Sequence, residues 1–161
     1  MIAAIFAVDE DDGIGLNGSM PWPHNKSDMV WFKRTTQHHV VVMGRNTWES
    51  TGILKPLPNR VNVVATTQPL DTTDAIVISG DVCIELSRLQ QEHYPNHIFV
   101  IGGANILLQS LPVLDRIYIT RIEGKYNCSI KLDTTQFIKG FKLVSKMLFE
   151  FCAVETYERI S

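Results

Sequence analysis

The sequence predicts an α/β domain with a mostly parallel central sheet. Short apolar runs that resemble buried strands alternate with segments of helical character, and this alternation is typical of parallel sheets covered by helices. Residues 141–159 instead alternate apolar and polar side chains, which predicts an antiparallel hairpin at the end of the chain. We therefore expect a mixed, mostly parallel sheet with an antiparallel C-terminal hairpin, flanked by about four helices.

Size and composition favour one domain over residues 1–161. Of the 161 residues 45% are hydrophobic, and the formal net charge is −2, so the chain can bury a substantial core and carries no nucleic-acid footprint. Three cysteines without a C-x-x-C pair indicate free thiols in a reducing compartment. The apolar N-terminus lacks a basic start and is too short for a signal peptide or a membrane span. We expect a cytoplasmic monomer that binds neither nucleic acid nor membranes.

The first strand is predicted over residues 2–8, where a continuous apolar run indicates burial on both faces. A pliable loop with Gly13, Gly15 and Gly18 follows, and then a helix over about 27–37 with Ser27 as its cap. The same alternation predicts later strands at 39–43, 61–66, 75–79, 97–101 and 115–122, and helices after Gly44 to about Ser50, at 81–92 and at 104–110. Residues 123–133 are expected to form a loop.

Asp28 is the informative residue of the first helix. It lies in the first turn and shares a helix face with Met29 and Phe32. A carboxylate among apolar side chains is costly unless it is paired, so a cationic or amidine-like ligand edge is one interpretation. The alternative is a helix-start carboxylate that faces water.

Two other groups of residues resemble metal ligands. The acidic run 9–12 could bind a divalent cation, but it lacks the spacing of a calcium loop and is expected to be a solvated loop. His93 and His97 are four residues apart, but Pro95 interrupts the helix that would align them. We therefore expect no metal site.

Two strand–glycine–helix turns have the pattern of an anion site. One spans Gly44 to Thr47 and the other contains Gly102-Gly103; each could present helix amides to a phosphate or be a plain turn. The pattern is not G-x-G-x-x-G, so a Rossmann domain is not supported. In a parallel sheet, ligands bind at the carboxyl ends of the strands. Both turns and Asp28 follow such ends, so we expect them to surround one site.

The chain resembles the dihydrofolate reductase family. The resemblance rests on Gly13-Ile14-Gly15, Met20-Pro21-Trp22, Asp28, Phe32 and Thr36 at their spacing. It continues at 42–50, 57–60 and 100–104, and it fades after about Glu123. It implies the single-domain fold of that family, with an adenosine-binding subdomain at roughly 39–95. It also implies NADPH-dependent reduction of 7,8-dihydrofolate to tetrahydrofolate, by hydride transfer to C6 with protonation of N5.

The resemblance also implies roles for individual residues. Catalytic roles fall to Asp28, Met20, Trp22 and Thr120, with Asp28 on the pterin's N3 and 2-amino edge and Thr120 supporting it. The substrate-binding residues would be Ile5, Ala7, Asp28, Met29, Phe32, Leu57, Arg60, Ile101 and Thr120, with Arg60 on the substrate's α-carboxylate. The cofactor-binding residues would be Ala7, Ile14, Gly15, Asn17, Gly18, Ser19, Gly44, Arg45, Asn46, Thr47, Thr66, Thr67, Ile101, Gly102, Gly103, Ala104, Asn105, Ile106, Leu107 and Gln109. A cis peptide between Gly102 and Gly103 is implied as well.

Four positions depart from the family pattern. Leu107 stands where an aromatic residue is frequent near the nicotinamide, and Cys128 where an acidic residue is common. Ser79 and Asn105 stand where basic residues often assist at the adenosine 2′-phosphate, which leaves Arg45 as the expected cation there. Two alternatives remain at this point: a related pterin or pyrimidine reductase of the same fold, and a catalytically silent nucleotide-binding protein. Without the family match, Thr120 and the apolar lining residues would be ordinary strand and core residues.

Overall fold

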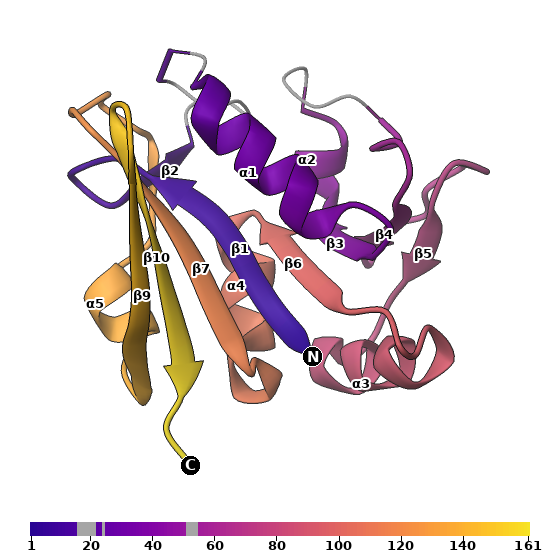
Figure 1. Cartoon of the computed structure of the whole chain (residues 1–161). Coiled ribbons are helices and arrows are strands. Elements are labelled where there is room, and N and C mark those ends of the chain that lie inside the picture. Colours follow the sequence, from indigo (N-terminus) through magenta and orange to yellow (C-terminus); the bar gives the residue numbers. More distant parts are fainter. Residues whose placement is uncertain (16–21, 24, 51–54) are drawn as a thin grey trace.

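A mixed eight-stranded sheet forms the centre of the computed structural model, which describes residues 1–15, 22–23, 25–50 and 55–161 (Figure 1). Its strands are β1 (Ile2–Val8), β3 (Val40–Gly44), β4 (Val61–Ala65), β5 (Ile76–Ile78), β6 (Ile98–Gly102), β7 (Arg116–Ile122), β9 (Phe141–Phe149) and β10 (Cys152–Arg159). They lie in the order β5-β4-β3-β6-β1-β7-β10-β9.

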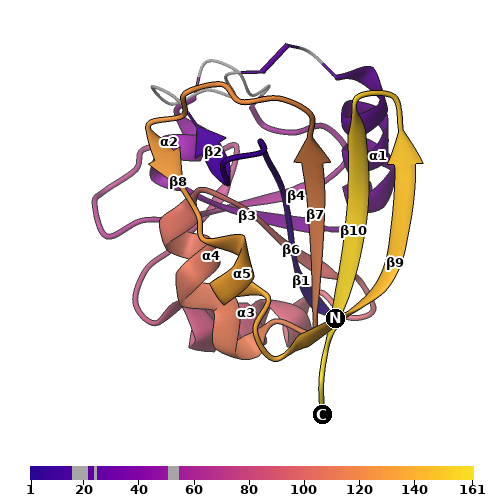
Figure 2. The same ribbon diagram turned by 90° about the vertical axis from the view of Figure 1, so that its left-hand side faces the viewer.

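Pairing within the sheet is parallel from β5 to β7 and antiparallel at β10. Strand β10 pairs antiparallel with both β7 and β9, and the β9–β10 hairpin forms one edge of the sheet (Figure 2). The predicted mixed sheet with a C-terminal antiparallel hairpin is therefore confirmed. The parallel arrangement brings the carboxyl ends of β1, β3, β4 and β6 to one edge, which is where ligands bind in open α/β sheets.

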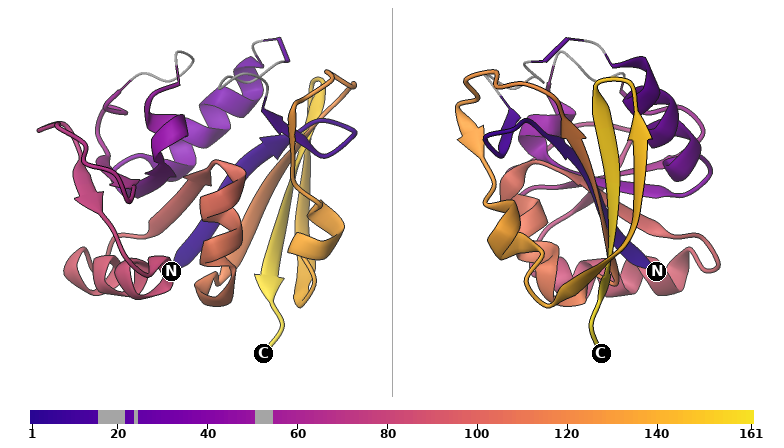
Figure 3. Two further views of the ribbon diagram at one scale, coloured as in Figure 1. Left: turned by 180° about the vertical axis from the view of Figure 1, so that it is seen from behind. Right: turned by 60° about the vertical axis from the view of Figure 1, so that its left-hand side comes forward.

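Strand β1 is buried on both faces, as its continuous apolar run predicts. Residues Ala3 and Ile5 face a core cluster that includes Trp48 of α2 (Arg45–Trp48) and has Phe32 of α1 (Lys26–Thr36) packed against it. The alternate residues, including Ala4 and Phe6, face a second cluster beneath α3 (Val82–Glu92), α4 (Ala104–Ser110) and α5 (Thr134–Phe137). The helices thus form a layer on each face of the sheet (Figure 3). The short 3₁₀ helix η1 (Leu111–Val113) follows α4.

Helix α1 begins one residue earlier than predicted, and Ser27 is not its cap. The side chain of Asn25 occupies the cap position, and its Oδ1 accepts the Asp28 backbone N–H at 2.9 Å. Asn is about as good a cap as Ser, so cap preference alone does not favour Ser27 over Asn25. The consequence is that Asp28 lies in the first helical turn, as expected, with its backbone fixed by the cap.

The acidic segment 9–12 is only partly the solvated loop that we expected, because Glu10 and Asp11 are exposed in a turn whereas Asp9 is buried. Asp9 is only 2% exposed, and its carboxylate accepts hydrogen bonds from the backbone N–H groups of Gly13 and Tyr126. Asp12 bonds the Thr134 hydroxyl at 2.8 Å and the Arg121 guanidinium at 3.3 Å. The segment leads into β2 (Gly13–Gly15), which pairs with β8 (Ile130–Lys131) inside the stretch expected to be a loop. These bonds replace water as partners of the Asp9 and Asp12 carboxylates.

The helices in the described ranges are short. None of them combines the length and the apolar character that crossing a bilayer requires. The proposed adenosine-binding subdomain at roughly 39–95 remains a prediction.

Candidate active site

A cavity of about 1140 Å³ opens at the carboxyl ends of the parallel strands. Strands β1, β3, β4, β6 and β7 contribute to its walls, together with α1, α2 and the start of α4. Asp28, the Gly44 turn and the Gly102-Gly103 turn all line it, so the expected convergence of these three features is found.

The carboxylate of Asp28 faces this cavity rather than bulk water. The hydroxyl of Thr120 on β7 donates a hydrogen bond of 2.8 Å to its Oδ1. Burial raises the pKa of the Asp28 carboxyl, and the Thr120 bond opposes this increase without cancelling it. The site therefore holds a half-buried acid that accepts a proton more readily than an ordinary aspartate does.

The half of the cavity around Asp28 is apolar. Every residue predicted to bind substrate lines the cavity: Ile5, Ala7, Asp28, Met29, Phe32, Leu57, Arg60, Ile101 and Thr120. Such a lining suits a flat heterocycle, with few polar groups to orient it.

Arg60 is held in place at the edge of this apolar half. Its Nη1 donates to Thr36 Oγ1 at 3.1 Å, its Nε donates to the Pro58 carbonyl at 3.0 Å, and its guanidinium lies 5.9 Å from the centre of the Phe32 ring. Burial lowers the pKa of Arg60, but an arginine stays charged at any physiological pH. Among the described residues, Nη2 has no partner from the protein, so it can bind a carboxylate.

The other half of the cavity is built on the two glycine turns. A Cβ on Gly44 would lie 3.9 Å from the backbone N of Gly103, so the turns lie against each other. A cis peptide joins Gly102 to Gly103, as the resemblance implied, and Gly102 has a φ of 125°, which favours glycine. Two adjacent turns with little side-chain bulk suit the close approach of a phosphate to the backbone, so this half of the cavity fits a phosphorylated cofactor.

Most of the predicted cofactor residues line the cavity. They are Ala7, Ile14, Gly15, Gly44, Arg45, Asn46, Thr47, Thr66, Thr67, Ile101, Gly102, Gly103, Ala104, Asn105, Ile106 and Gln109. Arg45 is partly engaged, because its Nε pairs with Glu49 at 3.0 Å and its Nη1 donates to the Pro69 carbonyl at 2.9 Å. Ser79, Asn105 and the acidic Glu85 also line this half, and the described part of the chain brings no second cation to it.

Two predicted residues do not line the cavity. Leu107 has no exposed surface and packs in the core beneath the sheet, and its role in binding the cofactor stays a prediction. Trp22 is 7% exposed and packs with Ile122, Cys128 and Cys152. Its ring makes an edge contact with Tyr126, at 6.4 Å between ring centres. Met20, Asn17, Gly18 and Ser19 lie outside the described residues.

Several lining residues were not predicted. Lys26 and Lys33 on α1, Glu85 on α3 and Ile130 on β8 also line the cavity. The two lysines lie seven residues apart, which places them on one helix face, so their spacing was a usable signal. Ile130 carries no such signal, because its place depends on the unpredicted pairing of β8 with β2. Within the described ranges, no group of His, Cys, Asp and Glu residues could hold a metal ion.

The fold and the cavity together define an α/β enzyme with one cleft for two ligands, an apolar one and a phosphorylated one. The family model described as dihydrofolate reductase matches residues 1–153. The dihydrofolate reductase of Bacillus subtilis is 37% identical over 132 residues, which cover 78% of this chain and 71% of that protein. The dihydrofolate reductase of Cryptococcus neoformans is 32% identical over 169 residues, which cover 82% of this chain and 73% of that protein.

A solved structure gives the same result. Dihydrofolate reductase from Enterococcus faecalis, complexed with NADP(H) and RAB-propyl, has a TM-score of 0.80 and 29% identity, and it covers 100% of this chain and 97% of that one. The chain therefore belongs to the dihydrofolate reductase family. It is an oxidoreductase that reduces 7,8-dihydrofolate to 5,6,7,8-tetrahydrofolate with NADPH.

Proposed function

We propose that Asp28 and Thr120 form the catalytic centre of this dihydrofolate reductase. The observation that carries this assignment is the 2.8 Å hydrogen bond between Thr120 Oγ1 and Asp28 Oδ1, inside an apolar cavity. When bound, NADPH supplies the hydride that reduces C6 of the substrate. The protein's own part is to bind the pterin, orient it, exclude water and favour the protonation of N5.

Asp28 binds the N3 and 2-amino edge of the pterin. Two parallel charge-assisted hydrogen bonds match this amidine-like edge, whereas an asparagine would present one acceptor and one donor. The raised pKa of Asp28 helps the site to take up a proton, which reaches N5 through water rather than directly. The pterin and the benzoyl ring pack on Ile5, Ala7, Met29, Phe32, Leu57 and Ile101.

Arg60 binds the α-carboxylate of the substrate. Its contacts with Thr36 and Pro58 fix the guanidinium, so little side-chain entropy is lost when the carboxylate binds. Its planar donors match a carboxylate better than the ammonium of a lysine would.

The glycine turns hold NADPH beside the pterin. Gly44 to Thr47, Thr67 and Gly102 to Ile106 bind its phosphates and ribose, and Arg45 binds the 2′-phosphate. Met20, Asn17, Gly18 and Ser19 keep their predicted roles in covering and binding the nicotinamide, and Trp22 keeps its predicted catalytic role. The domain spans 1–161, with an adenosine-binding subdomain at roughly 39–95. The protein acts as a cytoplasmic monomer without nucleic-acid or membrane partners.

A spectrophotometric assay of NADPH oxidation with 7,8-dihydrofolate tests this assignment. The parent protein should consume NADPH only when dihydrofolate is present, and Asp28→Asn should lose most of this activity. A catalytically silent nucleotide-binding protein would bind NADPH without oxidising it, and a related reductase would prefer another pterin or a pyrimidine substrate. Either outcome would overturn the proposed roles of Asp28 and Arg60.

A further inference from the structure

We propose that Asp9 is a positioning residue for the cofactor half of the cavity. It does not line the cavity itself, and its side chain is almost fully buried. Its Oδ1 accepts the backbone N–H groups of Gly13 at 2.8 Å and Asp11 at 2.9 Å. Its Oδ2 accepts the backbone N–H of Tyr126 at 3.0 Å and the Cys128 thiol at 3.5 Å. One carboxylate thus joins two segments that are more than a hundred residues apart in the chain.

Both segments lead directly into the cavity wall. Gly13 begins β2, and the next two residues, Ile14 and Gly15, line the cavity. Cys128 lies two residues before Ile130 of β8, which also lines the cavity and pairs with β2. Asp9 therefore fixes β2 and β8 relative to each other immediately next to the residues that form the wall.

The packing around Asp9 leaves little freedom for this arrangement. A Cβ on Gly13 would lie 2.4 Å from the Cys128 sulfur and 2.9 Å from Asp9 Oδ1, so only glycine allows the two segments to approach. Asp9 adds side-chain bonds to both segments, beside the backbone pairing of β2 with β8.

The charge of Asp9 is balanced by backbone dipoles rather than by a cation. Burial would raise the pKa of its carboxyl, but the N–H groups of Gly13, Tyr126 and Asp11 and the Cys128 thiol lower it below its ordinary value. A carboxylate can accept hydrogen bonds on both oxygens, whereas an asparagine would turn one N–H₂ group toward N–H donors. The arrangement of the two segments therefore depends on an ionised Asp9.

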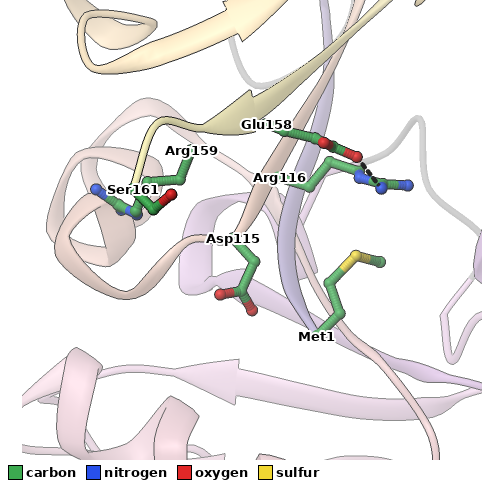
Figure 4. Close-up of a pocket in the computed structure, with 6 residues that line it drawn as sticks. All are labelled: Met1, Asp115, Arg116, Glu158, Arg159 and Ser161. Carbon is green, nitrogen blue, oxygen red and sulfur yellow. Dashed lines mark hydrogen bonds and ion pairs between the residues drawn. The ribbon is translucent and has the colours of Figure 1, made fainter. Parts of the chain in front are cut away.

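This inference rests on the proposed assignment of Ile14 and Gly15 to the cofactor. The test compares Asp9→Asn with Asp115→Asn, a matched control at the other end of β1. Asp115 Oδ2 accepts the Ile2 backbone N–H at 2.9 Å, so it makes the same kind of bond. Asp115 lies in a surface pocket beside the paired Arg116 and Glu158, at the amino end of the strand and away from the cavity (Figure 4).

Calorimetry would measure NADPH binding to each protein without substrate, and the assay would give the KM for dihydrofolate. We expect Asp9→Asn to raise the Kd for NADPH by about tenfold and to change the KM for dihydrofolate by less than about twofold. Asp115→Asn should lower the unfolding temperature without changing the Kd for NADPH. If Asp9→Asn is less stable but binds NADPH as tightly as the parent, or if both ligands weaken equally, Asp9 is not a positioning residue for this half.

A milder variant covers the case in which Asp9→Asn does not fold. Cys128→Ala removes one of the four contacts of Asp9 and should raise the Kd for NADPH in the same direction by a smaller factor. An unchanged Kd in the folded Cys128→Ala variant would then overturn the inference. The proposed function fails separately, if the parent protein does not oxidise NADPH with dihydrofolate.

Discussion

The Thr120 hydroxyl and the Asp28 carboxylate are joined by a hydrogen bond of 2.8 Å across 92 residues of sequence. It links β7 of the sheet to the first turn of α1, which lies over one face of that sheet. The bond engages Oδ1, and no described residue bonds Oδ2. The carboxylate is therefore oriented by the protein and still open to a ligand.

Asp28→Asn should lower turnover at neutral pH by at least about a hundredfold, because a bidentate ionic contact and the aid to protonation are both lost. Folding should survive. The folded-state pKa of Asp28 is raised, so its charged form costs stability at neutral pH, and the variant should unfold at the same or a higher temperature. Steady-state kinetics and thermal unfolding check the two parts, and parent-like turnover would contradict the role of Asp28.

Thr120→Val should shift the pH dependence of kcat/KM to higher pH. The Thr120 bond opposes the effect of burial on the pKa of Asp28, so its loss leaves that pKa higher still. The matched control is Thr156→Val, a buried threonine on the neighbouring strand β10 that has no bond to Asp28. A shift of equal size in both variants would indicate a general packing effect.

Arg45→Ala should raise the KM for NADPH by about tenfold or more and leave the KM for NADH nearly unchanged, because hydrogen bonds to a charged 2′-phosphate are lost only for NADPH. Lys33→Ala is the matched control, since Lys33 is a cation of the same cavity on α1. It should leave the ratio of the two KM values as it is. If Arg45→Ala weakens both cofactors equally, Arg45 shapes the loop at Pro69 instead of binding the phosphate.

Arg60→Lys should raise the KM for dihydrofolate by about tenfold with little change in the KM for NADPH. Lysine keeps the charge but lacks the planar donors that bond a carboxylate, Thr36 and Pro58 at the same time. A dihydrofolate analogue without the glutamate carboxylates should bind the parent and the variant equally well. An equal loss for the analogue would show that Arg60 acts on the shape of the pocket.

The free energy of unfolding should fall as the pH decreases from about 7 to 5, partly because of His39 and His97. The two rings stack with centres 5.0 Å apart. Burial lowers the pKa of both, with nearby positive charge as the second cause: His97, His38 and the chain's amino group at His39, and the amino group and Arg116 at His97.

Stability falls at low pH because these histidines bind protons more weakly in the folded state than in the unfolded state. The unfolded chain takes up protons at a higher pH than the folded one, so stability is full above the ordinary histidine pKa and falls below it. His97→Gln should flatten the dependence of stability on pH, measured by urea unfolding. Parallel curves for the parent and His97→Gln would exclude the pair as the cause.

Much of the fold was predictable, because its strands are local features of the sequence. The buried strands β1, β3 and β6 are continuous apolar runs, β4 is apolar except for Asn62, and the bounds of all four agree with the prediction to within about one residue. The pairing of β2 with β8 was missed because two glycines in three residues carry no strand pattern. The burial of Asp9 was missed because its partners Tyr126 and Cys128 are set by tertiary structure, 117 and 119 residues away.

The site was predicted to a similar extent and for a similar reason. The strand–glycine–helix pattern locates the two turns, and parallel pairing brings them together. The burial of Leu107 was not predictable in this way, because α4 packs on the sheet and the family pattern alone does not say which side of this short helix Leu107 occupies.

The central place of β1 has a consequence for how the chain is made. The first strand to be synthesised lies between β6 and β7, and the residues that pair with Ala3 are Phe99 and Arg116. Before the ribosome has added these later strands, β1 has no neighbour in the sheet, and its apolar side chains are not yet buried by them. Non-local pairing of this kind slows folding and exposes apolar surface to aggregation. The first strand of this enzyme therefore has no sheet neighbour until β6 has been made, and it gains its second neighbour only with β7.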